Sequence, residues 1–177
     1  MKDKLFKIKG TKFFDNRGYF LNLFRQNEDV YSNAWGNRKI EQINLSESFK
    51  IGTIRGLHFQ KSPYLDAKII RCLEGKIWDV AVDLRKESRD YKKWYAIELD
   101  SIESDALFIP EGFAHGFQVL EPNTKVLYIH SSPWKKSHDS GIRWNDKILD
   151  ISWPLKVSDM SERDKNLPFL EENEINL

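Results

Sequence analysis

The sequence is poor in cysteine. Cys72 is the only one among 177 residues, so the chain can form neither an internal disulfide nor a metal site built from several thiolates. Cys72 lies in the apolar run Lys68–Leu73, which is typical of a strand. We interpret it as a small buried side chain rather than a nucleophile.

The sequence also lacks a charge excess and a long hydrophobic run. Lys plus Arg number 28 and Asp plus Glu number 27, which speaks against nucleic acid as a partner. No apolar stretch near the N-terminus could serve as a signal sequence or a membrane span, so we expect no membrane partner and a cytoplasmic location. Hydrophobic residues make up 40% of the chain, which is enough for one packed domain over residues 1–177.

Helical periodicity is scarce as well. Short strand-like runs separated by turn residues cover most of the chain, and the best helix candidates lie near Gln26–Trp35 and Ser161–Asp164. This pattern predicts an all-β fold, either a sandwich or a barrel, with a few short peripheral helices.

Two details of the strand pattern can be tested. In the alternating run Ile77–Leu84, Asp79 and Asp83 share one face, which either lines a polar cavity or, as is more common for a sheet, meets water. Glu121–Thr124 lies between two apolar runs and predicts the turn of a β-hairpin.

One short segment combines a cation, an imidazole and an amide. In Ile54–Gln60, strand alternation places His58 and Gln60 on one face and Arg55 on the other. A single histidine on a strand is more often a hydrogen-bonded structural residue than a catalyst, so both roles stay open here. Ten residues further on, Lys68 lies among apolar neighbours, where it either reaches water from a strand edge or points into a ligand cavity.

The segment Pro110–His115 has the spacing Pro-x-Gly-x-x-His, which resembles the second motif of the cupin barrels. In metal-binding cupins this histidine is a ligand, together with a His-x-His pair. Here His58-Phe59-Gln60 has no second histidine, and His130 and His138 are not spaced to replace it, so the donors fall short of the three or four that a metal needs. We therefore predict a cupin-like jelly-roll β-barrel without a metal, and surface or structural roles for His130 and His138.

Two aromatic residues each allow two interpretations. Tyr128 lies on a predicted strand, where a tyrosine usually packs against its neighbours. Trp134 follows a proline in a loop, where it either covers the core or forms a flat wall against which a sugar or a base stacks.

Taken in order, these segments resemble the dTDP-4-dehydrorhamnose 3,5-epimerase family from about Phe13 to Pro168. The matching stretches are Asp15–Phe20, Arg55–Gln60, Trp78–Arg85, Ile109–Phe117, Gly141–Asp146, Trp153-Pro154, and Ser161 with Asp164. Each motif alone is weak, but all of them in sequence order form a strong signal. The resemblance implies one cupin-like epimerase domain, with an N-terminal strand at about residues 1–12 and a C-terminal extension at about residues 155–177.

The resemblance also implies a substrate, a partner and a set of site residues. The substrate is a nucleotide-linked 4-keto-6-deoxy sugar, most simply a dTDP-sugar, no cofactor is needed, and the partner is a second copy of the chain, since the family exchanges N-terminal strands between subunits. The implied catalytic residues are His58 as the general base, Asp164 as the carboxylate that orients it, Tyr128 as the acid on the opposite face of the sugar, and Lys68 as the cation near the ketone oxygen. The implied substrate-binding residues are Arg17 and Arg55 near the diphosphate, Gln42, Asn44 and His115 in the cavity, and Trp134 beside the sugar.

The expected chemistry agrees with these residue types. A ketone at carbon 4 acidifies the protons on carbons 3 and 5, and a cation near the oxygen stabilises the enolate that forms when one of them leaves. A histidine can accept that proton at neutral pH, and a tyrosine, protonated up to about pH 10, can return one to the other face. The planar fork of an arginine suits a diphosphate.

Asn22 departs from the family pattern, because a glutamate often occupies this position near the nucleotide end of the site. Alternatives therefore include an epimerase that inverts one carbon of another nucleotide-linked keto sugar, and a non-catalytic sugar-binding cupin. A 3,4-ketoisomerase and a metal-dependent dioxygenase rank lower. The combination of His58, Lys68, Tyr128 and Asp164 favours a catalyst, because a binding module needs no acid–base pair.

Overall fold

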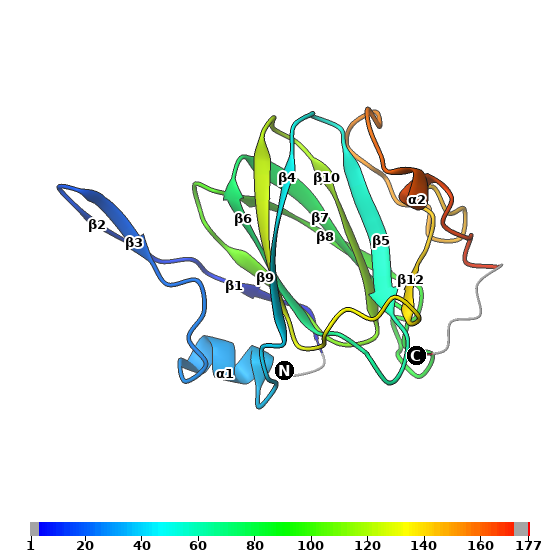
Figure 1. Ribbon diagram of the computed structural model, residues 1–177, viewed down its shortest axis with the longest axis horizontal. Coiled ribbons are helices and arrows are strands. Elements are labelled where there is room, and N and C mark those ends of the chain that lie inside the picture. Colours follow the sequence, from blue (N-terminus) through cyan, green and yellow to red (C-terminus); the bar gives the residue numbers. More distant parts are fainter. Residues whose placement is uncertain (1–3, 172–176) are drawn as a thin grey trace.

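Two five-stranded antiparallel sheets, packed face to face, form the body of the protein in a computed structural model that describes residues 4–171 and 177 (Figure 1). Sheet 1 has the strand order β1-β9-β6-β11-β4, sheet 2 has the order β12-β5-β10-β7-β8, and β2 and β3 form a separate hairpin. The strands are β1 (Phe6–Ile8), β2 (Lys12–Asp15), β3 (Gly18–Leu21), β4 (Gln42–Ser48), β5 (Ile54–Gln60), β6 (Lys68–Glu74), β7 (Lys76–Asp83), β8 (Trp94–Asp100), β9 (Ala106–Ile109), β10 (Phe113–Val119), β11 (Thr124–His130) and β12 (Asp139–Gly141). The two helices are α1 (Asp29–Trp35) and α2 (Glu162–Lys165).

The chain passes repeatedly from one sheet to the other, as in a jelly roll. Strands β4, β6, β9 and β11 belong to sheet 1, whereas β5, β7, β8 and β10 belong to sheet 2. The predicted all-β cupin-like jelly roll with a few short helices is therefore confirmed. In the part of the chain that the structure describes, no helix is long and apolar enough to cross a membrane.

The hairpin predicted around Glu121–Thr124 is wrong. This turn carries the chain from β10 in sheet 2 to β11 in sheet 1, and each strand pairs within its own sheet: Val119 lies opposite Ile77, and Val126 lies opposite Cys72. A turn signal reports only that the chain reverses. The sheet that each strand joins depends on partners far away in the sequence.

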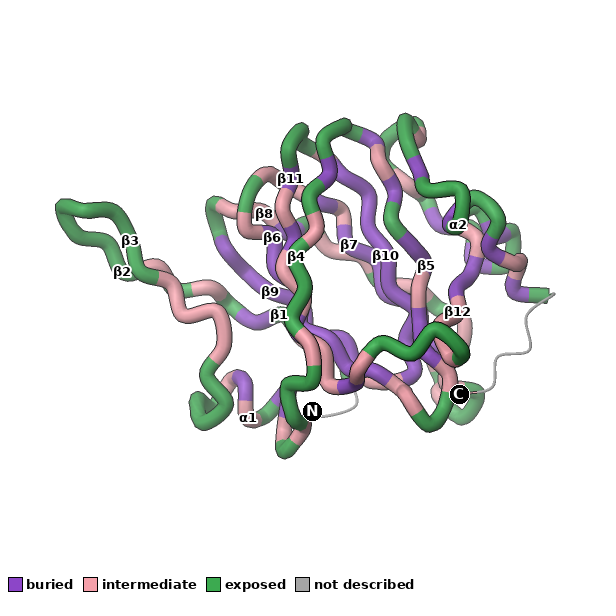
Figure 2. The backbone as a smooth tube through the Cα atoms, viewed as in Figure 1, coloured by how far each residue is buried: buried purple, intermediate pink, exposed green. Residues whose placement is uncertain are grey.

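Three apolar layers hold the sandwich together, and Figure 2 shows buried residues along the strands. The space between the sheets is filled by side chains such as Ile70 and Phe117. The outer face of sheet 1 is covered by α1, whose Trp35 is fully buried. The outer face of sheet 2 is covered by the segment after β12, with Leu149 and Leu170. Each large side chain buried in this way contributes about 1.5–3 kcal/mol to stability.

Both faces of β7 are consequently buried, and the expectation that its carboxylates meet water is wrong. The side chains of Asp79 and Asp83 are 0% and 1% exposed. Asp83 is paired with Arg85 and Ser88, and Asp79 contacts His115. By strand alternation these carboxylates share a face of β7 with Ile77 and Ala81, which pack between the two sheets. Asp79 therefore lies on the cavity side, the other of the two expected alternatives.

The N-terminal and C-terminal regions lie on opposite sides of the body. Strand β1 pairs with β9 at the edge of sheet 1, and the β2–β3 hairpin projects away from the sandwich (Figure 1). The extension predicted from about residue 155 includes α2, which packs near β5. The acidic composition of Glu171–Glu174 predicts a frayed tail, but this segment lies mostly outside the described residues, since residues 172–176 are not described.

Candidate active site

A pocket with a volume of about 860 Å³ lies between the two sheets. Of the ten side chains implicated above, nine line it and Arg17 does not. Sheet 1 contributes Gln42, Asn44, Lys68 and Tyr128, sheet 2 contributes Arg55, His58 and His115, and the segments that follow the sheets contribute Trp134 and Asp164. Residues that lie far apart in the sequence are thus brought to one cavity.

The bulge in β5 explains why Arg55 and His58 both face this pocket. His115 on β10 lies opposite His58, and Phe117 lies opposite Arg55, so two steps along β10 match three steps along β5. The extra residue changes the alternation, and the expectation that Arg55 and His58 point to opposite faces is wrong. The bulge includes Gly56, where a Cβ atom would lie 2.6 Å from the Gly116 Cα atom, so the close approach of the two strands requires glycine.

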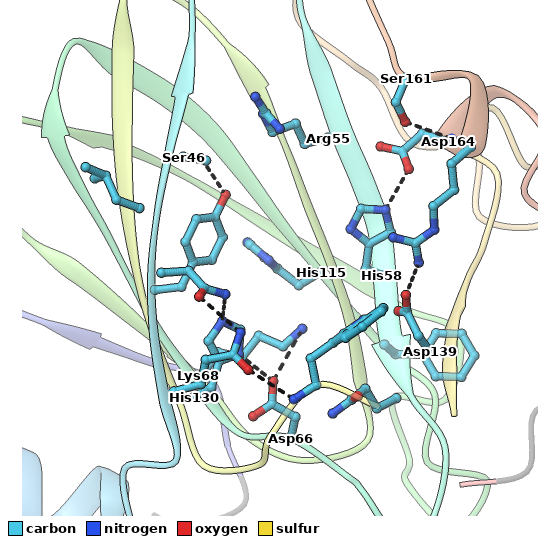
Figure 3. Close-up of a pocket in the computed structure, with 18 of the residues that line it drawn as sticks. Ser46, Arg55, His58, Asp66, Lys68, His115, His130, Asp139, Ser161 and Asp164 are labelled. Carbon is cyan, nitrogen blue, oxygen red and sulfur yellow. Dashed lines mark hydrogen bonds and ion pairs between the residues drawn. The ribbon is translucent and has the colours of Figure 1, made fainter. Parts of the chain in front are cut away.

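His58 is held by a buried carboxylate. The His58 Nε2 atom lies 2.7 Å from Oδ1 of Asp164, and the Gly56 backbone N–H donates to Oδ2 of the same residue over 3.1 Å. Asp164 is 4% exposed and lies on α2, whose first turn is capped by Ser161. Figure 3 shows the His58 ring between Asp164 and the interior of the pocket.

Asp164 remains ionised at neutral pH. Burial disfavours its charged form, but the hydrogen bonds from His58 and from the Gly56 N–H, together with the charge of His58, outweigh this effect and lower the pKa of Asp164. An ionised Asp164 accepts the Nε2–H of His58, which leaves the lone pair of Nδ1 free to accept a proton. It also stabilises the imidazolium that results.

Replacing Asp164 by asparagine is expected to lower kcat/KM at least about 100-fold, since the amide can no longer both accept from His58 and stabilise its cation.

Because the folded-state pKa of Asp164 is lowered, its contribution to folding is complete above the unfolded value of about 3.9 and is lost as the pH falls through the folded value. The difference in unfolding free energy between wild type and Asp164→Asn should therefore shrink below about pH 3.9. Urea unfolding at several pH values would measure it, and a difference that is the same at pH 7 and in acid would contradict this account.

Tyr128 lies on the sheet 1 side of the pocket. Its hydroxyl is 3.0 Å from Oγ of Ser46 on the neighbouring strand β4. Burial raises the pKa of Tyr128, although the hydrogen bond from Ser46 and the charge of Arg55 act in the opposite direction. Figure 3 places Ser46 and His58 on opposite sides of the pocket, with His115 between them.

His115 lies at the bottom of the pocket and is 5% exposed. Its Nε2 atom is 2.9 Å from Oδ2 of Asp79. Burial lowers the pKa of His115 in spite of the opposing effect of Asp79. His115 is therefore a neutral imidazole that donates to Asp79, and its remaining nitrogen is an acceptor.

Lys68 lies in a central position and points into the cavity. Its strand, β6, is flanked by β9 and β11 in the middle of sheet 1, so the interpretation as an edge lysine that reaches water is wrong. The residue is 7% exposed and lines the pocket, with Nζ 3.9 Å from Oδ2 of Asp66. A buried ammonium with one distant carboxylate is well placed to receive a second negative group.

The two arginines expected near a diphosphate are in different places. Arg55 is exposed at the rim of the pocket and donates to Oγ of Ser48 and to the backbone oxygen of Glu47. Arg17 is at the turn of the β2–β3 hairpin, where it pairs with Asp15 and its side chain is 85% exposed. Within one chain, Arg17 therefore does not reach the pocket.

The structure adds lining residues that the sequence reasoning missed. Among them are the polar residues Ser46, Asp66, His130, Ser132, Asp139 and Arg163. Strand alternation from Tyr128 would have found His130, and alternation from Gln42 and Asn44 would have found Ser46. Asp66 precedes its strand and carried no signal. His130 therefore lies in the pocket with Nδ1 2.7 Å from Oδ2 of Asp66, which agrees with the expected structural role and not with a surface position. His138 contacts Ser137 and Tyr64 outside this pocket.

Among residues 4–171 and 177, no group of three or more His, Cys, Asp or Glu side chains is arranged to hold a metal ion. Cys72 is buried, as the sequence predicts, and burial raises the pKa of its thiol to about 12. The absence of a metal requirement stays a prediction.

Comparisons with known proteins agree with this architecture. The model of the family described as dTDP-4-dehydrorhamnose 3,5-epimerase matches residues 3–172. A dTDP-4-dehydrorhamnose 3,5-epimerase of Shigella flexneri is 42% identical over 156 residues, which cover 87% of this chain and 84% of the relative. The crystal structure of a Bacillus anthracis dTDP-4-dehydrorhamnose 3,5-epimerase with TDP and PPi bound is 40% identical, with a TM-score of 0.88 and 94% of both chains covered.

A more distant structure broadens the comparison. A 3'-monoepimerase from Streptomyces bikiniensis in complex with dTDP-quinovose is 26% identical, with a TM-score of 0.85, and the match covers 95% of this chain and 84% of that one. Since the family match spans nearly the whole sequence and the relatives share its fold, this chain belongs to the dTDP-4-dehydrorhamnose 3,5-epimerase family.

Proposed function

We propose that this epimerase inverts carbons 3 and 5 of a dTDP-linked 4-keto-6-deoxy sugar through an enolate. The observation that carries the proposal is the pair of His58, held by the buried Asp164, and Tyr128 on the opposite sheet, both lining one pocket of about 860 Å³. Epimerisation needs a base on one face of the ring and an acid on the other, and the two sheets offer one group each.

The first step is proton removal by His58. Its Nδ1 atom takes the proton from carbon 3 or carbon 5, and Asp164 stabilises the imidazolium across the 2.7 Å contact. The electrons move to the oxygen on carbon 4. The buried ammonium of Lys68 stabilises the negative charge that develops there, in a site where water screens it weakly.

The second step is reprotonation from the other face. The raised pKa of Tyr128 keeps its phenol protonated, so that the group enters the reaction as an acid. When the proton leaves, Ser46 can turn its hydroxyl to donate to the phenolate over the 3.0 Å contact. The Arg55 charge also favours the phenolate.

The substrate class comes from the relatives and fits the rim of the pocket. The Bacillus anthracis structure contains TDP, and Arg55 at the rim offers a guanidinium for a diphosphate. An epimerase of one carbon is the second candidate, because the Streptomyces bikiniensis 3'-monoepimerase has the same fold. Asn22, which contacts Glu28 here, is the residue that we expect to influence recognition of the base. The cytoplasmic location stays part of this proposal.

Solvent exchange tests the function and separates the candidates. The protein is incubated in heavy water with a panel of nucleotide-linked 4-keto sugars, and the position of the label is read by NMR. We expect deuterium at carbons 3 and 5 of the dTDP-4-keto-6-deoxy sugar. Label at one carbon alone would support the single-carbon epimerase, and binding without label would support a sugar-binding cupin.

A homodimer is the expected assembly. Phe13, Phe14 and Phe20 on the β2–β3 hairpin are 62%, 75% and 65% exposed, and the edge strand β4 exposes Ile43 and Leu45. Exposed apolar groups on a projecting hairpin and on a sheet edge favour a protein partner. A dimer in which the hairpin of one subunit covers the pocket of the other would bring Arg17 to the substrate.

Light scattering at micromolar concentration measures the assembly. We expect twice the mass of one chain for the wild type and the mass of one chain for the double variant Phe14→Asp, Phe20→Asp. The variant Ile102→Asp is the matched control, since Ile102 is 79% exposed in the turn after β8. A monomeric wild type would contradict the prediction.

A further inference from the structure

A continuous row of hydrogen bonds, absent from the mechanism above, runs along one side of the pocket from Asp66 to the backbone of Trp134. Its members are Asp66, His130, Asn44, Gln42 and Trp134, which come from three separate parts of the sequence. The inference drawn from it rests on the proposed function, since it concerns affinity in the same pocket.

The row begins at a buried carboxylate. Asp66 is 7% exposed, and its Oδ1 atom accepts from the backbone N–H groups of Ser131 and Ser132 over 3.1 and 3.2 Å. Its Oδ2 atom lies 2.7 Å from Nδ1 of His130. The Nδ1 atom therefore carries the hydrogen, because an ionised carboxylate only accepts.

The direction of every later bond follows from this start. With its hydrogen on Nδ1, His130 accepts at Nε2 from the Asn44 amide over 3.3 Å. Asn44 in turn accepts at Oδ1 from the Gln42 amide over 3.0 Å, and Gln42 accepts at Oε1 from the backbone N–H of Trp134 over 3.0 Å. Each amide uses its donor and its acceptor once, so the row is complete when His130 is a neutral imidazole.

The loop at the end of the row bridges the two sheets. On the sheet 2 side, Gln60 accepts from the Lys135 N–H over 2.7 Å and donates to the Pro133 oxygen over 3.2 Å. On the sheet 1 side, Gln42 holds the N–H of Trp134. The Trp134 side chain is 54% exposed and lines the pocket, so its position depends on these two anchors.

We propose that His130 is a positioning residue which, through Asn44 and Gln42, fixes the Trp134 loop and thereby sets the affinity for the sugar part of the substrate. Without an acceptor at the Nε2 position, the Asn44 amide loses this hydrogen bond. Asn44 then no longer holds the Gln42 amide in one orientation, and Gln42 is the residue that anchors the loop on the sheet 1 side. His58 and Asp164 are on sheet 2 and α2, away from the row. The loss therefore falls on binding rather than on proton transfer.

Two substitutions of His130 distinguish its contact with Asp66 from its contact with Asn44. His130→Asn places an amide where Nδ1 faces Asp66, but nothing reaches the position of Nε2. His130→Gln can place its amide oxygen near the Nε2 position and accept from Asn44. We expect KM to rise about tenfold in His130→Asn and to stay within about threefold of wild type in His130→Gln, with kcat within about twofold in both. His138→Asn, on the same loop but outside the pocket, should match wild type in both constants.

A second measurement does not depend on turnover. Protein labelled with 5-fluorotryptophan gives a ¹⁹F signal for Trp134, which is assigned by its loss in Trp134→Phe. In the ligand-free protein, this signal should shift or broaden in His130→Asn and keep its wild-type position in His130→Gln. Gln42→Ala removes the last bond of the row and should reproduce the changed signal, which keeps the test available if His130→Asn does not fold.

The outcomes are distinct. An unchanged Trp134 signal in His130→Asn and Gln42→Ala would overturn the proposal. So would a fall in kcat at constant KM, because the His130 ring lies parallel to the Tyr128 ring at 5.9 Å, and such a result would place the effect on Tyr128. If the wild type converts none of the keto sugars, the proposed function fails, whereas the fluorine signals still decide whether His130 positions the loop.

Discussion

Replacing His58 by alanine is expected to abolish deuterium exchange at both carbon 3 and carbon 5. Both protons are acidified by the same ketone, and His58, with Asp164 2.7 Å away, is the base that we assign to both. A general base contributes about 10²–10⁴-fold, and alanine leaves Oδ1 of Asp164 without its contact to His58. NMR of the sugar after incubation in heavy water measures the loss at each carbon separately.

The control for this variant removes a different imidazole, one that lies outside the pocket. His138→Ala serves, because His138 lies on the loop after β11, where it contacts Ser137 and the Tyr64 ring outside the pocket. Its exchange rates should equal those of wild type. Thermal unfolding of His58→Ala shows whether the fold survives. Normal turnover by a folded His58→Ala variant would show that another group is the base, and exchange surviving at one carbon would show that each carbon has its own base.

The local pattern of residues predicted much of the fold and of the pocket. Strand alternation identifies the runs that become β6 and β7, and it explains why Gln42 and Asn44, two residues apart on β4, both face the cavity. The helix candidate at Ser161–Asp164 is α2, which carries Asp164 and is capped by Ser161. These features depend on neighbours in the sequence, which is the information that a single sequence contains.

Features that depend on distant partners were missed. Alternation gave the wrong face for Arg55, because the bulge in β5 exists only in the pairing with β10. It favoured water over a cavity for the face of Asp79, whereas this carboxylate contacts His115 on the side of β7 where Ile77 and Ala81 pack between the sheets. Asp66 contacts His130, which is 64 positions away in the sequence, and no pattern near either residue predicts this contact.

Replacing Tyr128 by phenylalanine is expected to retain proton abstraction and to lose inversion. The phenyl ring keeps the shape of the pocket wall, while His58 and Asp164 on the other sheet remain in place. The enolate then forms as before, but it regains a proton only from His58, on the face from which the proton left. The substrate should therefore acquire deuterium with its original configuration, and we expect inversion to fall by about 10²–10⁴-fold.

The comparison of exchange with inversion decides between the two interpretations of Tyr128. Tyr95→Phe is the matched control, since Tyr95 is 43% exposed on β8, and both rates should be those of wild type. If Tyr128→Phe inverted the sugar at the wild-type rate, the residue would be a packing side chain and the acid would lie elsewhere. If exchange and inversion fell together, Tyr128 would assist proton removal as well. Exchange without inversion is the outcome that requires two separate groups on opposite faces of one sugar, as the positions of His58 and Tyr128 on opposing sheets imply.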